Sequence, residues 1–246
     1  MTTTRSDTRT TARTAIVTGA SRGLGLALTS ALARQGWHVV ADARDGQALH
    51  AAVHTALGAD PHVTLVAGDV TDPAHRQALI DAAGGSIDLV VNNAGGLGPS
   101  PLPALDSVDP NELATLFAVN VVAPLALIQT AFPHLAPHAT IVNITSDASV
   151  EPYEGWGVYG TTKAALDHLG AVLAAENPGV RVLTLDPGDM RTRMHQDAFP
   201  GEDISDRPLP EASVPGILTL IDSDTASGRY RIAQVDPVEV SHQEVA

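Results

Sequence analysis

The sequence predicts an α/β protein: a single doubly wound parallel sheet of about seven strands with helices on both faces. Short β-branched runs alternate with alanine-rich helical segments along the chain. The strand runs are continuously apolar, which is typical of parallel strands covered on both faces. With 246 residues, 44% of them hydrophobic, the chain is long enough for one large domain of this class.

The expected elements alternate in order. Strands are expected at residues 15–18, 37–41, 63–66, 87–91, 139–144, 180–185 and 228–233. Helices are expected after the first strand to Arg34, at residues 47–57, after Asp72-Pro73, after Asp109-Pro110, and from Tyr159 to about Ala175. Both Asp-Pro pairs place an aspartate at the N-cap and a proline in the first turn. No repeat or linker divides the chain, so we expect one domain over residues 14–235, a disordered arm at 1–13 and a loose acidic tail at 236–246.

Composition excludes several classes of protein. The formal charge is −14 and the pI is near 4.9, which disfavours binding to nucleic acid or an anionic membrane surface. The chain has no cysteine, so thiolate catalysis and disulfides are excluded. The N-terminus lacks the apolar segment of a secretory signal, and the apolar stretch Leu113 to Ile128 is too short to span a bilayer. His50 and His54 lack a third ligand, so no metal site is expected. A cytoplasmic location is therefore the expectation.

The turn between the first strand and the first helix is rich in glycine. Its glycines follow the spacing Gly-x-x-x-Gly-x-Gly within Thr18 to Gly25. Glycine permits a tight turn and lets a pyrophosphate approach the backbone at a helix N-terminus. An ordinary turn is the alternative, but the strand-turn-helix context is the one that a dinucleotide site requires. We therefore expect a Rossmann-type fold whose cofactor contacts here are Gly19, Ser21, Arg22, Gly23, Leu24 and Gly25.

The end of the second strand bears on the choice between NADP and NAD. An NAD enzyme usually places an acid near this point to bind the ribose 2′-hydroxyl, whereas an arginine suits a 2′-phosphate. Arg44 stands here, and Arg22 is a second candidate for the phosphate. Asp42 and Asp45 flank Arg44 and argue against a phosphate site. On balance we expect NADP(H), with NAD(H) as the less favoured cofactor.

Two further strand ends complete the expected cofactor half. Asp69-Val70 follows the third strand, where an adenine would lie. The run Asn92 to Gly95 follows the fourth strand, and a purely structural turn is the alternative for it. The expected contacts are Asp69, Val70, Asn92, Ala94 and Gly95.

Tyr159 and Lys163 are four residues apart, so on a helix they share one face. A nearby cation favours the phenolate and lowers the pKa of a tyrosine from about 10 towards neutrality. Ser146 lies thirteen positions before Tyr159, at the end of an apolar run. A hydroxyl and a phenol are donors that can stabilise charge growing on a carbonyl oxygen. Thr145 competes with Ser146 for the hydroxyl role, and a helix-surface pair is the alternative for Tyr159 and Lys163.

Together these segments resemble the short-chain dehydrogenase/reductase family. The resemblance covers about residues 14–192, in the family's order. The matching segments are Thr18 to Gly25, Asp69-Val70, Asn92 to Gly95, Asn120, Ile141 to Ser146, Tyr159 to Lys163, and Pro187-Gly188 with Thr192.

The resemblance implies a role for each matching residue. Tyr159 would be the general acid, and Lys163 would hold the nicotinamide ribose and lower the pKa of Tyr159. Ser146 would bind the substrate carbonyl oxygen, and Asn120 would hold a water that links Lys163 to solvent. A structural amide with satisfied partners is the alternative for Asn120. The nicotinamide end of the cofactor site would comprise Pro187, Gly188, Met190 and Thr192.

The sequence also departs from the family. Many members end in an Asp-Gly-Gly-type segment after the last strand, whereas this chain has Ser227 to Gln234 without one. The segment Arg193 to Pro210 is interpreted as a mobile lid or a passive loop. Candidate pocket residues are Gly96, Leu97, Asp147, Tyr153, Trp156, Asp189, Met190 and Met194. The acids before Tyr159 raise the hypothesis of a cationic substrate, with a solvated acidic loop as the favoured alternative.

These observations predict an NADP(H)-dependent ketoreductase that transfers hydride between the nicotinamide and a ketone or secondary alcohol. A non-catalytic NADP(H)-binding regulator is one alternative, and a dehydratase or isomerase on the same scaffold is another. The family resemblance also suggests a homodimer or homotetramer, in which the helix bearing Tyr159 packs against a partner copy.

Overall fold

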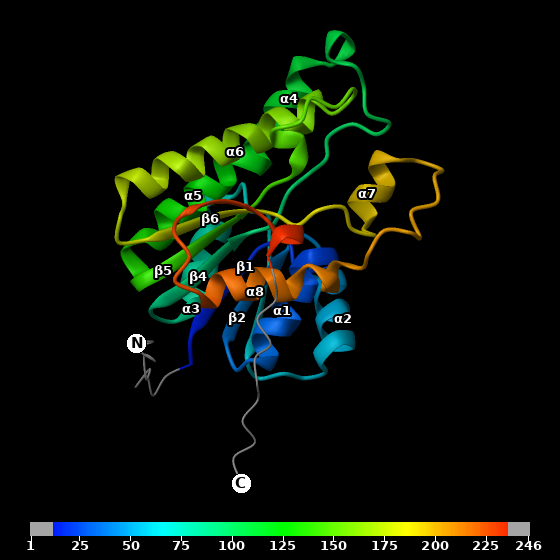
Figure 1. Cartoon of the computed structure of the whole chain (residues 1–246). Helices are drawn as coiled ribbons and strands as arrows, with labels where there is room; N and C mark the ends of the chain where they lie inside the picture. Colours follow the sequence, from blue (N-terminus) through cyan, green and yellow to red (C-terminus); the bar gives the residue numbers. More distant parts are fainter. Residues whose placement is uncertain (1–11, 236–246) are drawn as a thin grey trace.

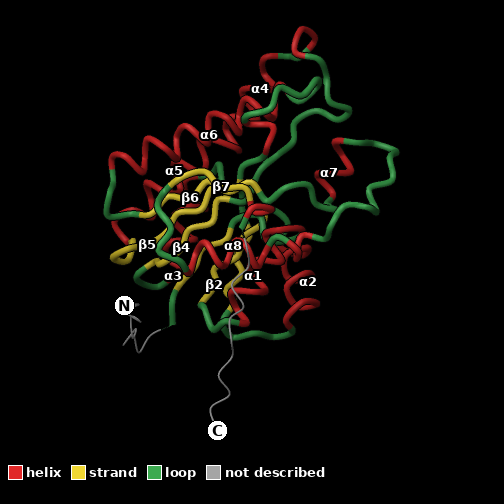
Figure 2. The backbone as a smooth tube through the Cα atoms, viewed as in Figure 1, coloured by secondary structure: helices red, strands yellow, loops and turns green. Residues whose placement is uncertain are grey.

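A seven-stranded parallel sheet forms the centre of the protein. The computed structural model describes residues 12–235. The strand order is β3-β2-β1-β4-β5-β6-β7, and every pairing is parallel. This order, with the first strand in the middle, confirms the doubly wound arrangement expected from the sequence (Figure 2). The strands are β1 (Thr14–Val17), β2 (His38–Ala43), β3 (Val63–Ala67), β4 (Ile87–Asn92), β5 (Leu135–Ile144), β6 (Arg181–Asp186) and β7 (Gly228–Arg231).

Helices cover both faces of this sheet (Figure 1). Helices α1 and α8 share one apolar cluster with the strands, and α3 and α5 share another on the opposite face. Asp45, Asp72 and Asp109 cap α2, α3 and α4, each by accepting backbone N–H groups of the first turn. The helices are α1 (Gly23–Arg34), α2 (Gly46–Leu57), α3 (Pro73–Ala83), α4 (Pro110–Phe117), α5 (Ala123–Ala131), α6 (Gly157–Glu176), α7 (Arg193–Ala198) and α8 (Val214–Asp222).

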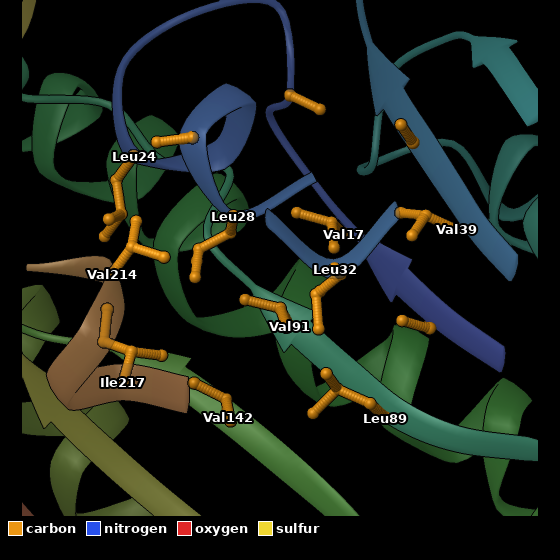
Figure 3. Close-up of a cluster of buried hydrophobic side chains, with 14 of the residues drawn as sticks. Val17, Leu24, Leu28, Leu32, Val39, Leu89, Val91, Val142, Val214 and Ile217 are labelled. Carbon is orange, nitrogen blue, oxygen red and sulfur yellow. The ribbon is translucent and has the colours of Figure 1, made fainter. Parts of the chain in front are cut away.

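The core follows from the alternation of side chains along each strand. In β1, Val17 joins the cluster under α1 and α8, while its neighbour Ile16 joins the cluster under α3 and α5. Figure 3 shows the first cluster, in which Leu28 and Ile217 lie over the strands. The inner strands β1, β2 and β4 are buried on both faces, which explains their apolar runs in the sequence.

Three segments differ from the sequence expectation. Helix α8 was not expected, and a short helix, α7, lies within the segment expected to be a lid or loop. Strand β5 begins at Leu135, before the expected start at residue 139, and it contains a left-handed residue, His138, with φ of 65°. A π turn, Ala118–Val122, joins α4 to α5 and carries Asn120.

One helical run in residues 12–235 is long and apolar enough to cross a membrane by length and composition alone. This run, Pro110–His134, has 25 residues and is longer than the apolar stretch identified in the sequence; one third of its apolar 18-residue window is buried. In this fold α5 packs against α3, and the π turn packs against α6. Core helices of soluble proteins pass the same test, so the run is weak evidence for a membrane span.

The expected arm and tail fall almost entirely on residues 1–11 and 236–246, which lie outside the described part of the chain. The last residue of the expected arm, Arg13, is placed: its guanidinium lies 3.9 Å from the ring centre of Trp37 and binds Asp222 at 2.8 Å.

Candidate active site

A cavity of about 1010 Å³ lies at the carboxyl ends of the parallel strands. Open α/β sheets bind ligands at this edge because the loops that follow the strands meet there. The cavity collects residues that the sequence analysis assigned to the cofactor and to catalysis. They are Gly19, Ser21, Arg22, Gly23, Leu24, Arg44, Asp69, Val70, Ala94, Gly95, Ser146, Tyr159, Lys163, Pro187, Gly188, Met190 and Thr192.

The glycine turn has the shape that a dinucleotide requires. Gly19 and Gly23 have φ of 71° and 58°, which side chains other than glycine rarely adopt. At Gly25 an added Cβ would lie 2.3 Å from the carbonyl oxygen of Gly19, so glycine here lets α1 pack against the turn. The N-cap residue of α1, Arg22, forms no side-chain cap. The first N–H groups of α1 are therefore available to an anion.

The carboxylates of both acids beside Arg44 form hydrogen bonds with other groups of the protein. Asp42 is 1% exposed; its Oδ1 accepts the backbone N–H of Gly19 at 2.7 Å, and its Oδ2 pairs with Nε2 of His75 at 2.9 Å. Asp45 accepts two backbone N–H groups as the N-cap of α2. Arg44 itself is exposed and lines the cavity. The sequence suggested that these two acids argue against a phosphate site. Because their carboxylates are bound by other groups, that objection does not hold.

Asp69 and Val70, which were expected to contact an adenine, both line the cavity. Oδ1 of Asp69 accepts the backbone N–H and the hydroxyl of Thr71, both at 2.8 Å. These two hydrogen bonds hold the pKa of Asp69 below its ordinary value. The carboxylate thus stays ionised and fixed at the cavity wall.

Tyr159 and Lys163 are both buried in the wall of the cavity, at 7% and 5% exposure. Nζ of Lys163 lies 5.5 Å from the ring centre of Tyr159 and donates a hydrogen bond to the carbonyl oxygen of Ile144 at 2.8 Å. Burial lowers the pKa of Lys163 to about 8, and the negative charge of Asp167 opposes this effect. The alternative of an exposed helix-surface pair is therefore wrong.

The pKa of Tyr159 lies above its ordinary value. Burial is the largest cause, a hydrogen bond with Ser146 acts in the opposite direction, and the charges of Asp147 and Asp186 add to the increase. The net direction is opposite to the one expected from the Tyr-Lys spacing, because desolvation of the phenolate outweighs the groups that stabilise it. In the protein alone, Tyr159 is thus a protonated donor.

The hydroxyl of Ser146 is held by its neighbour in the sequence. Its Oγ donates to Oδ1 of Asp147 at 3.0 Å, and the hydroxyl of Tyr153 donates to Oδ2 of the same carboxylate at 3.0 Å. The competing hydroxyl, Thr145, is 2% exposed and has no hydrogen-bond partner in the described structure. Ser146 is therefore the hydroxyl that is oriented beside the phenol.

Asn120 does not line the cavity. It is 1% exposed in the π turn; its Nδ2 donates to the carbonyl of Gly96 and to the hydroxyl of Thr162, and its Oδ1 accepts the N–H of Gly96 at 2.8 Å. These hydrogen bonds give Asn120 the structural role named as its alternative. Its Oδ1 and Nζ of Lys163 both face Gly95, since a Cβ added there would lie 3.2 Å from the first atom and 3.7 Å from the second.

Asn92 was expected to contact the cofactor, but it does not line the cavity. It is buried in β4 and donates a hydrogen bond to Asn143, while the next residue, Asn93, lines the cavity. Nδ2 of Asn93 donates to the carbonyls of Thr18 and Gly19. Adjacent side chains at a strand end point to opposite sides, so the amide that contacts the glycine turn is Asn93.

Helix α7 and the loop before α6 form the other wall. The rings of Trp156 and Phe199 are 5.9 Å apart, and Trp156 is 5.8 Å from Tyr159. All candidate pocket residues line the cavity except Leu97, which is buried in the adjacent apolar cluster. The expected lid thus contributes a helix and an aromatic side chain, Phe199, to the site.

Comparison with known proteins identifies the family. A family profile described as short chain dehydrogenase matches residues 13–203. This chain belongs to the short-chain dehydrogenase/reductase family. Sepiapterin reductase of Meriones unguiculatus is 37% identical to it over 198 residues, 74% of this chain and 75% of that protein. Benzil reductase ((S)-benzoin forming) of Saccharomyces cerevisiae is 34% identical over 194 residues, 74% of this chain and 73% of that protein.

A solved structure of a short chain dehydrogenase from Shigella flexneri complexed with NADP has the same fold. Its TM-score is 0.80 at 27% identity, and the match covers 90% of this chain and 97% of that one. The cavity of the present protein suits the phosphates of a dinucleotide. Its glycine turn has glycines with positive φ, the N-terminus of α1 has no side-chain cap, and two arginines line the cavity.

Sequence reasoning about this short-chain dehydrogenase/reductase missed several site residues. Asn93 was inside a predicted segment but was not chosen. The buried His75 was not identified because its partner, Asp42, is 33 residues away along the chain. Arg229 gave no signal beyond the unusual final strand that contains it.

Proposed function

We propose that this protein is an NADP(H)-dependent ketoreductase. The observation that supports it best is one cavity that joins Ser146, Tyr159 and Lys163 to a phosphate-compatible glycine turn. The named relatives, a sepiapterin reductase and a benzil reductase, support a carbonyl substrate. The aromatic and sulfur side chains around Trp156 and Phe199 suit a ketone with a flat apolar substituent.

In the proposed reaction the carbonyl carbon would receive a hydride, which NADPH would supply when bound. Tyr159 donates its phenolic proton to the carbonyl oxygen as negative charge develops there. Ser146 turns its hydroxyl from Asp147 to the same oxygen and stabilises that charge. Lys163 holds the nicotinamide ribose and stabilises the phenolate left on Tyr159. General acid catalysis of this kind contributes roughly 10²–10⁴-fold to rate.

The preference for NADP(H) rests on Arg22 and Arg44. Both line the cavity, and the acids that would compete with a 2′-phosphate are held by the backbone and by His75. A charge-assisted contact is worth roughly 1.5–3 kcal/mol. Replacing Arg44 with alanine should therefore weaken NADPH binding by roughly 10- to 100-fold and leave NADH binding unchanged. Arg34→Ala, on the far end of α1, is the control. Equal loss for both cofactors would overturn the assignment.

The activity is tested by following NADPH oxidation against a panel of ketones that includes benzil. Tyr159→Phe should reduce kcat by at least about 100-fold with NADPH binding retained. Tyr230→Phe, which removes a hydroxyl from β7 that contacts the carbonyl of Ala226, is the matched control. Turnover that is equal in wild type and Tyr159→Phe would remove Tyr159 from its role. Binding of NADPH without turnover would favour the regulator, and substrate conversion without net NADPH oxidation would favour the dehydratase or isomerase.

We also propose that the protein is a soluble, cytoplasmic homodimer or homotetramer. Val122, Phe132 and Val172 are exposed on the α5 and α6 side of the sheet, at 58%, 38% and 41%. Such side chains suit an interface with a second copy. Sedimentation that finds only monomer at micromolar concentration would contradict this part of the proposal.

A further inference from the structure

Arg229 of β7 connects three segments of the proposed site. Its Nη2 donates to the backbone carbonyl of Ser146 at 3.0 Å, and its Nε donates to Oδ2 of Asp167 at 3.0 Å. Its Nη2 also lies 3.3 Å from Oδ2 of Asp186. One guanidinium thus joins the loop of the catalytic serine, helix α6 and the end of β6.

Each partner of Arg229 is next to a residue of the proposed chemistry. Asp167 lies one helical turn after Lys163 on α6 and influences its pKa. Asp186 precedes the turn of the nicotinamide end and accepts the N–H of Gly188 at 3.0 Å. Ser146 presents its carbonyl to Arg229 and its hydroxyl to the cavity. A change in the position of the guanidinium would therefore displace all three segments.

Of the two carboxylates that Arg229 binds, Asp186 is buried and Asp167 is partly buried. The side chains of Asp186 and Asp167 are 3% and 16% exposed. Buried carboxylates need cationic partners with good geometry, which makes the position of this guanidinium well determined. Arg231, two residues along β7, also binds Asp186, at 3.3 Å, but its side chain is 46% exposed, and this hydrogen bond reaches Asp186 and not the loop of Ser146.

We propose that Arg229 is a positioning residue that fixes the Ser146 loop relative to α6 and to the turn at Gly188. This inference rests on the proposed reductase function. Gly228-Arg229 of β7 brings a guanidinium against the backbone of the Ser146 loop. Arg229 acts through the carbonyl of Ser146 and does not touch the substrate.

The test compares three variants. Arg229→Met should lower kcat by roughly 100-fold, because a misplacement of about 1 Å can cost that much, and this loss should exceed any weakening of NADPH binding through the turn at Gly188. Arg229→Lys should restore part of kcat, because an ammonium can still donate to the Ser146 carbonyl. Arg231→Met, which removes only the second partner of Asp186, is the matched control and should keep most of kcat. Circular dichroism and urea unfolding confirm that each variant is folded.

A second readout does not depend on turnover. Lys163 is the sole lysine of the chain, so the ¹³Cε resonance of labelled lysine reports its pKa directly. Removal of Arg229 frees the negative charge of Asp167, which should raise the pKa of Lys163, while Arg231→Met should leave it unchanged. If no ketone is reduced by the wild type, the proposed function fails but this measurement still tests the contact. Unchanged kcat and unchanged Lys163 pKa in folded Arg229→Met, or an equal loss of kcat in Arg231→Met, would overturn the inference.

Discussion

Replacing Lys163 with methionine should change how the stability of the protein depends on pH. The side chain is 5% exposed, and burial lowers its pKa from 10.5 to about 8. The unfolded chain therefore binds the proton more tightly than the folded chain does. Stability is therefore highest above pH 10.5, where Lys163 is neutral in both states. It decreases as the pH falls from 10.5 to about 8, because the unfolded chain takes up a proton that the folded chain does not.

The magnitude follows from the two pKa values. The lowered pKa of Lys163 destabilises the folded protein by about 3 kcal/mol at pH 7, where the buried lysine is charged. At pH 9.5 the cost is about 1 kcal/mol, because the folded chain gives up a proton that the unfolded chain still binds. Methionine is similar in length and has no proton to bind, so this cost disappears. It also cannot donate to the carbonyl of Ile144, which costs roughly 1–3 kcal/mol at any pH. The difference in stability between wild type and variant should therefore change by about 2 kcal/mol between these two pH values.

Urea unfolding of both proteins at pH 7 and pH 9.5, at constant ionic strength, measures this change. Wild type should gain stability relative to Lys163→Met as the pH rises. Leu166→Ala, a buried apolar substitution one turn along α6, should lower stability by the same amount at both pH values. A difference between wild type and Lys163→Met that is independent of pH would refute the reasoning, as would a lysine ¹³Cε titration centred near 10.5.

Three further predictions concern the same site. Asp147→Asn removes a charge that raises the pKa of Tyr159; the alkaline fall in kcat/KM for ketone reduction should move to lower pH, and a pH profile with its fall in the same place would contradict this. Gly25→Ala places a Cβ 2.3 Å from a backbone oxygen of the glycine turn; we expect loss of NADPH binding by titration, and retained affinity would show that the turn tolerates a shift of α1. His75→Leu leaves the buried carboxylate of Asp42 without its partner and should cost roughly 3–5 kcal/mol in urea unfolding; a loss below about 1 kcal/mol would mean that solvent reaches the carboxylate.

Local patterns were enough to predict most of the fold. Apolar runs and Asp-Pro caps placed the first six strands and their helices within a few residues of the structure. Helix α8 was missed because it begins with Val214-Pro215-Gly216, which resembles a loop. Proline is nevertheless compatible with a first turn, and Gly216 is needed because an added Cβ would lie 2.7 Å from Ile232. That contact exists only in the folded chain.

The candidate site was predicted where its chemistry depends on spacing along one element. Tyr159 and Lys163 share α6, and the glycine turn is continuous in sequence. The prediction failed where a side chain's direction is set by distant partners. In the sequence Asp42 argues against a phosphate site beside Arg44, but in the fold its carboxylate binds His75. Asn92 and Asn93 cannot be distinguished until the end of β4 is known.

The position of β7 has a consequence for how the protein becomes active during synthesis. Strand β1 lies at the centre of the sheet and is made before the other strands. Strands β2 and β3 extend the sheet on one side of it, and β4 to β7 extend the sheet in order on the other side. Domains begin to fold from the N-terminus while the chain is still being made. Six strands and the glycine turn can therefore assemble before Arg229 leaves the ribosome. A nascent chain at that stage already holds the glycine turn, and the loop of Ser146 gains its arginine only after β7 has been added.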